Sequence, residues 1–193
     1  LGHATRCIPI IRELIKNNND VVIATDGYPL ILLRQEFPKL QFIELSSYPI
    51  QYSKTKSQVF AIVRSIPTIL YGIYKEHKWL DKILKTRHFD TVISDNRFGL
   101  FSKYVHSVYI TQQLMIKMPV SCKFLEPIAW LIHRKFIHKY DKCLIPDYEN
   151  AENLSGDLSH KYKLPTNSMF IGNLSRFEKI KPDMDVKRFS VVV

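Results

Sequence analysis

The sequence predicts an α/β fold with a Rossmann-like, doubly wound and mainly parallel sheet. Short runs rich in β-branched residues alternate with amphipathic segments along the 193-residue chain, which is the order expected when helices connect the strands of one sheet. The runs are apolar at nearly every position, as in strands that helices cover on both faces. No internal repeat interrupts this alternation.

Six runs are predicted to be strands. Each is bounded by turn residues and is too short and too apolar to form a surface helix. The six runs are Asp20–Thr25, Gln41–Leu45, Thr91–Asp95, Ser107–Thr111, Asp141–Pro146 and Ser168–Gly172.

Helices are predicted between these runs. The first begins at "GHATR" and places Ile8 and Ile11 on one apolar face. Pro67 is expected to kink or divide the longest helix, and a short helix is expected to start near Arg97. The other predicted helices are Pro29–Phe37, Thr55–Thr86 and Phe124–Tyr140.

Charge is the most informative feature of the composition. The net charge is +10, and the basic residues concentrate in 54–88 whereas 141–160 is acidic. A basic surface favours partners that carry phosphate: nucleic acid, anionic lipid or phosphorylated small molecules. No apolar run is long enough to cross a membrane and no signal peptide precedes the first helix, so we expect a soluble, cytoplasmic protein.

Several classes of site lack their sequence signatures. The three cysteines are widely spaced, so they indicate neither a disulfide framework nor a zinc site. The chain has no phosphate-binding P-loop, no HExxH and no complete GxGxxG. It also lacks the aromatic signature of RNA-binding domains and the zinc-finger spacing, so nucleic acid is an unlikely partner.

Ligands of an open parallel sheet bind beyond the carboxyl ends of its strands, and the first such junction is "GHATR". Gly2 allows a tight turn, and the free amides at the start of a helix favour an anion. His3 lies at the same point and could act as a base near neutral pH. The alternative is that His3 is a terminal or capping residue without a catalytic role.

Two further strand ends carry polar side chains. After Thr91–Asp95, Asn96 and Arg97 either face the cleft, where Arg97 could hold a phosphate, or belong to an ordinary helix cap formed by Asp95 or Asn96. After the next strand come three polar side chains, two of which are amides; they could bind sugar hydroxyls or could satisfy the loop backbone. These residues are Thr111, Gln112 and Gln113.

The segment "KFLEPIAWLIHRKFIHKY" interleaves aromatic and basic residues. This composition suits a helix lying on an anionic membrane, but it also suits a core-facing helix with a solvated back. The candidate membrane-contact residues are Lys123, Trp130, Arg134 and Lys135.

Four segments together resemble the N-terminal domain of a GT-B glycosyltransferase. They are "GHATRCIPIIREL", "VISDNRFGL", "YITQQL" and "LPTNSMFIGNLSRF". The resemblance is to family 28, which includes bacterial N-acetylglucosaminyltransferases that act on a lipid intermediate. It implies an acceptor domain over 1–172, lacking its first strand, and a hinge with the start of a truncated donor domain over 173–193.

The resemblance also implies an activity and a site. The full protein would transfer a hexose or N-acetylhexosamine from a nucleotide sugar to a lipid-linked or cell-envelope glycan acceptor at the inner face of the plasma membrane. It would need the nucleotide sugar as co-substrate, with no cofactor and no metal, and the isolated chain would be inactive. His3 would be the base, and Thr111 and Gln112 replace a His-Glu pair of the lipid-glycosylating enzymes. The implied acceptor-binding residues are Gly2, Thr5, Asn96, Arg97, Thr111, Gln112 and Gln113.

Two other functions fit the same sequence. A nucleotide-sugar 2-epimerase shares the two-domain architecture that the resemblance implies. A non-catalytic basic module that binds anionic lipid or nucleic acid would account for the charge.

Overall fold

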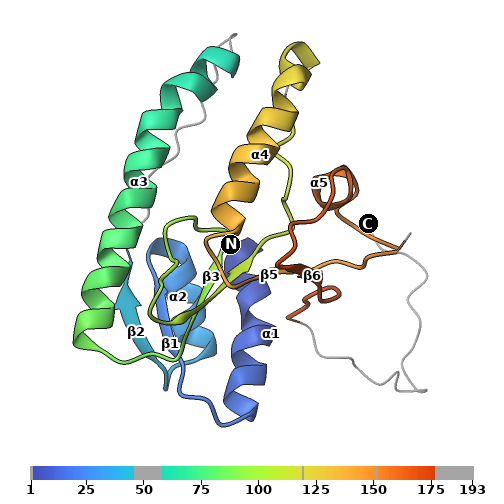
Figure 1. Cartoon of the computed structure of the whole chain (residues 1–193). Coiled ribbons are helices and arrows are strands. Elements are labelled where there is room, and N and C mark those ends of the chain that lie inside the picture. The colour runs from blue at the N-terminus through green and yellow to red at the C-terminus, as the bar shows by residue number, and fades with distance from the viewer. Residues whose placement is uncertain (1, 46–57, 119, 151, 177–193) are drawn as a thin grey trace, which may run out of the picture.

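The computed structural model describes residues 2–45, 58–118, 120–150 and 152–176 and confirms the α/β class with parallel strands (Figure 1). The sheets lie at the centre, and helices pack around them. The elements are α1 (Gly2–Lys16), β1 (Val22–Thr25), α2 (Gly27–Glu36), β2 (Gln41–Glu44), α3 (Gln58–Thr86), β3 (Thr91–Asp95), β4 (His106–Ile110), the 3₁₀ helix η1 (Val120–Leu125), α4 (Glu126–Ile137), β5 (Lys142–Ile145), α5 (Asp157–His160) and β6 (Ser168–Phe170).

The strands form two parallel sheets. β1 pairs with β2, and β3, β4, β5 and β6 follow one another in a second sheet in which Asp95 lies opposite Ile110. The sequence predicted a single sheet. The division lies between β1 and β3, and both strands line a cavity of about 830 Å³ whose wall also includes α1.

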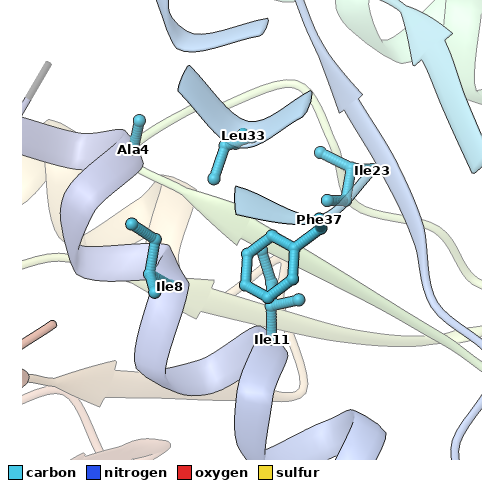
Figure 2. Packing of buried hydrophobic residues seen from close by; sticks show 6 residues of the cluster. All are labelled: Ala4, Ile8, Ile11, Ile23, Leu33 and Phe37. Atoms are coloured by element: carbon cyan, nitrogen blue, oxygen red, sulfur yellow. The ribbon is translucent and has the colours of Figure 1, made fainter. Parts of the chain in front are cut away.

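The apolar face of α1 packs against β1 and α2. Ile8 and Ile11 of α1 share one buried cluster with Ile23 of β1, Leu33 of α2 and Phe37, the residue that follows α2 (Figure 2). All of these side chains are buried, and burying a side chain of this size stabilises the fold by roughly 1.5–3 kcal/mol. The packing fixes the axis of α1 and therefore the position of its N-terminal turn.

The larger sheet has a core of its own. Tyr109 of β4 and Cys143 and Ile145 of β5 pack against Ile137 and Tyr140 at the end of α4. A third cluster joins α3 to the segment after β3 through Leu80 and Leu100. These two clusters hold α4 and α3 against the larger sheet.

The buried carboxylate of Glu76 links α3 to the segment that follows β3. Glu76 is 2% exposed and accepts hydrogen bonds from Arg97 Nε at 2.6 Å and from the Gly99 N–H at 2.9 Å. A Cβ at position 99 would lie 2.4 Å from the carbonyl oxygen of Ile73. Only glycine allows the chain to pass this close to α3.

Most predicted elements are confirmed within a few residues, but two details are wrong. The described residues between β3 and β4 contain no helix near Arg97, since Asn96 has φ 55° and turns the chain into a loop. α3 continues through Pro67, so the predicted division is wrong, whereas the predicted kink stays a prediction. Most of the expected donor-domain start over 173–193 and the first residues of the predicted helix Thr55–Thr86 fall outside the described residues.

Candidate functional site

The candidate site lies where α1 begins and β3 ends. The Nδ1 of His3, in the first turn of α1, is 3.4 Å from Oδ1 of Asp95, the last residue of β3. The His3 side chain is 62% exposed and that of Asp95 only 10%. The pair therefore combines an accessible imidazole with a carboxylate fixed in the protein, an arrangement that can remove a proton from a hydroxyl group.

Arg6 joins this pair to the neighbouring strand. It lies one turn after His3 on α1, and its Nη2 is 3.0 Å from His3 Nδ1 and also hydrogen-bonded to Asp95. Its Nη1 donates to Oε1 of Gln112 at 3.2 Å, and Gln112 Nε2 donates to the carbonyl of Pro146 at 2.7 Å. The site is thus a connected polar network that spans α1, β3 and the ends of β4 and β5.

The electrostatics of the network keep Asp95 ionised. Burial alone would raise the pKa of Asp95, but its contacts with His3 and Arg6 and the positive charge of Arg6 outweigh burial and hold this pKa below its ordinary value. The thiol of Cys7, 3.4 Å from Asp95 Oδ2, has a pKa raised by burial and by the adjacent carboxylate. Cys7 is therefore a neutral thiol beside the site and not a nucleophile.

A cavity of about 590 Å³ opens in front of this network. It is within the size range of small-molecule sites. Four residues singled out in the sequence line it, namely Gly2, His3, Thr5 and Gln112, and they are joined by Arg6, Leu174, Ser175 and Arg176.

The other predicted acceptor residues do not line this cavity, but Asn96 and Arg97 line the cavity of about 830 Å³ together with His3 and Asp95. Asn96 Oδ1 accepts hydrogen bonds from the hydroxyls of Tyr109 and Thr111, and Thr111 is 1% exposed. Gln113 is exposed but does not line the 590 Å³ cavity. Arg97 pairs with Glu76. These contacts favour structural roles for Asn96, Thr111 and Arg97.

Sequence reasoning missed two members of the network. Arg6 was not singled out, and Asp95 was considered only as a helix cap. The spacing of three residues between His3 and Arg6 was an available signal, because it places both side chains on one face of a helix. The second available signal was the position of Asp95 at the end of a predicted strand, where ligands of a parallel sheet bind.

The four predicted membrane-contact residues divide into two pairs. Lys123 and Lys135 are exposed. Trp130 and Arg134 are half-buried, since Trp130 stacks on Tyr162 with ring centroids 5.0 Å apart and Arg134 lies over Trp130. The sequence reasoning did not select the exposed apolar side chains of the same region, which are Phe124, Ile128, Leu131 and Ile132.

Fold and site together define a Rossmann-like α/β protein with a polar site at the carboxyl ends of parallel strands. Comparisons with protein-family models and with curated proteins find no match to the chain. Among the helices of the described ranges, none has the length and apolar character required to span a membrane. Over those same ranges, no group of three or more His, Cys, Asp or Glu side chains is placed to hold a metal ion.

Proposed function

We propose that this chain is the acceptor-side half of a nucleotide-sugar-dependent glycosyltransferase that transfers a hexose or N-acetylhexosamine to a lipid-linked or cell-envelope acceptor. The observation that carries the proposal is the His3–Asp95 pair at the mouth of a cavity beyond parallel strands. The sequence resemblance to GT-B enzymes of family 28 supplies the class of reaction. The co-substrate is a nucleotide sugar, and no cofactor is required.

In the proposed reaction His3 accepts the proton of an acceptor hydroxyl. The resulting oxygen attacks the anomeric carbon of the donor sugar, and the bond to the nucleoside diphosphate breaks. Asp95 stabilises the imidazolium that forms, because its carboxylate is ionised and within reach of Nδ1. Gly2, Thr5 and Gln112 line the space that the acceptor would occupy.

Replacing His3 with alanine is expected to lower turnover by about 100-fold or more, because general base catalysis contributes at least this factor. The assay uses the natural protein with UDP- and GDP-activated sugars and a membrane lipid extract, and measures sugar transferred to lipid. His106→Ala is the matched control, since His106 forms a surface pair with Asp141 at 3.5 Å and should leave turnover unchanged.

Two results would contradict this function. Near-normal turnover of His3→Ala would remove the base from the mechanism. Conversion of a nucleotide sugar to its epimer without any acceptor would assign the protein to the 2-epimerases.

We also propose that η1 and α4, together with α3, contact the anionic inner surface of the plasma membrane, which would place the cavity near a lipid-linked acceptor. α3 and α4 extend in the same direction beyond the sheets (Figure 1). Phe124 and Ile128 are 73% and 53% exposed, and on α3 Lys75 lies over the exposed ring of Tyr71. Apolar side chains bordered by lysines match a surface of anionic lipid.

Ile128→Glu is expected to weaken binding to phosphatidylglycerol vesicles about tenfold, because it removes the burial of one large apolar side chain and adds a repelled charge. Ile31→Glu on α2 is the matched control, since Ile31 is 55% exposed but lies outside the proposed surface. Cosedimentation with vesicles of phosphatidylcholine, with and without phosphatidylglycerol, measures both variants. An equal loss of vesicle binding in the two variants, or equal binding of the wild-type protein to vesicles with and without phosphatidylglycerol, would contradict the proposed membrane surface.

A further inference from the structure

The position of Arg6 bears on whether His3 can act as a base. Arg6 Nη2 is hydrogen-bonded to Asp95 and lies 3.0 Å from His3 Nδ1, closer than the 3.4 Å that separates this nitrogen from Asp95. Arg6 Nη2, His3 Nδ1 and Asp95 Oδ1 therefore form a compact triangle in which each atom is in contact with the other two. His3 and Asp95 each face the same cation.

A guanidinium can only donate hydrogen bonds, because all of its nitrogen lone pairs are delocalised into the cation. A His3 Nδ1 that accepts from Arg6 carries no proton, whereas an Nδ1 that donates to Asp95 carries one, so the two contacts correspond to the two tautomers. In the first tautomer the single proton of the neutral imidazole resides on Nε2. An Nε2 that carries a proton has no lone pair for the proton of an acceptor hydroxyl, and Nδ1 is blocked by Arg6.

The other tautomer requires Arg6 to be displaced. With a proton on Nδ1, His3 can donate to Asp95, and Nε2 is left unprotonated toward the exposed side. Since the His3 side chain is 62% exposed, water can remove the proton from Nε2 and supply one to Nδ1, so the exchange needs no other reactant. Arg6 keeps a hydrogen bond to Gln112 on its Nη1 side, and both line the cavity.

We propose that Arg6 is a positioning residue that holds His3 in its inactive tautomer until a phosphoryl oxygen of a substrate binds in the cavity and draws the guanidinium away. The proposal rests on the proposed role of His3 as the base. Phosphate is the chemistry that a guanidinium recognises through paired hydrogen bonds. Arg6 therefore allows His3 to remove the proton from the hydroxyl group of the acceptor substrate only when the phosphorylated substrate is bound.

The test reads the tautomer of His3 directly by ¹⁵N NMR of the imidazole, with the His3 signals assigned from their loss in His3→Ala. In the ligand-free protein we expect the proton on Nε2. In Arg6→Met, which has no donor, we expect the proton on Nδ1 without any ligand. Arg12→Met is the matched control, because Arg12 lies on the same helix but pairs with Glu36, and it should keep the ligand-free tautomer.

Ligand titrations of the wild-type protein provide a second measurement that does not depend on a variant. Pyrophosphate, uridine diphosphate and a short-chain phosphatidic acid are each added, and we expect the proton to move to Nδ1. Whether uridine diphosphate or the lipid phosphate acts at the lower concentration identifies the donor or the acceptor as the source of the phosphoryl group. Sodium chloride at equal ionic strength controls for screening.

Two results would overturn the proposal: Nδ1 already protonated in the ligand-free wild-type protein, or the proton remaining on Nε2 both in Arg6→Met and with all three phosphates. Because the tautomer is read without turnover, these results are distinguishable from failure of the proposed transferase reaction. A transferase whose His3 already carries its proton on Nδ1 would retain the function and lose only the control by Arg6.

Discussion

Replacing Glu76 with glutamine is expected to lower the free energy of unfolding by about 3 kcal/mol, the lower end of the cost of breaking a buried ion pair. Glu76 is buried, and its two oxygens accept from Arg97 and from the Gly99 N–H. Glutamine has one oxygen for these two donors, so its amide group must face one of them. The charge of Arg97, whose side chain is only 21% exposed, also loses its carboxylate partner.

A surface pair provides the matched control for this variant. Glu13 lies 3.6 Å from Lys16 on α1, and both side chains are more than half exposed. Glu13→Gln should therefore cost less than about 0.5 kcal/mol. Urea denaturation of the two variants measures the difference. An equal loss of unfolding free energy in the two variants would show that the buried Glu76–Arg97 pair contributes no more to stability than the exposed Glu13–Lys16 pair.

Asp147→Asn is expected to lower the free energy of unfolding at neutral pH by about 3 kcal/mol, because hydrogen bonds to a charged acceptor contribute most among protein hydrogen bonds. Asp147 is fully buried just after β5. Its oxygens accept from the backbone N–H groups of Tyr148, Leu154 and Ser155 at 2.8–2.9 Å, and from the Ser155 hydroxyl. An asparagine amide would place N–H groups against donors.

The same carboxylate gives stability a dependence on pH. Burial alone would raise the pKa of Asp147, but the hydrogen bonds from Ser155 and from the backbone hold it well below its ordinary value. A carboxylate whose pKa is lowered by folding contributes fully to the free energy of unfolding when the pH is above its pKa in the unfolded chain, which is about 4 for aspartate. This contribution is lost as the pH falls from there toward the lower pKa of the folded protein. The difference between wild type and Asp147→Asn should therefore shrink between neutral pH and about pH 3.

Urea denaturation at both pH values measures this effect. Asp157→Asn is the control, because Asp157 is an exposed residue near the same loop and its replacement should change stability little at either pH. A difference between wild type and Asp147→Asn that is constant across this range would contradict the assignment of the stability to the ionised carboxylate.

The strands could be predicted because local composition determines them. The predicted range Thr91–Asp95 coincides with β3, and the other strands differ by a few residues at their ends, where pairing with neighbours decides the boundary. Asn96 could not be predicted in the same way. Its left-handed backbone conformation and its contact with Tyr109 depend on the neighbouring strand, so no short-range pattern shows that a loop replaces the expected helix.

Side-chain partners across the fold explain the remaining differences at the site. Arg97 was considered as a phosphate ligand because nothing near it in the sequence indicates Glu76, which approaches from α3. His3 was selected from its place at a helix start, but its contacts with Asp95 and Arg6 depend on packing between α1 and β3. The sequence thus indicated the location of the site better than its internal connections.

The close approach of Gly99 to α3 has a mechanical consequence. A side chain at position 99 would overlap Ile73 and Glu76, so the contact runs from backbone to helix with no deformable side chain between them. The segment that meets α3 in this way directly follows Asp95 in the chain. One continuous helix thus joins the exposed rings of Tyr71 and Tyr74 to the segment that follows Asp95.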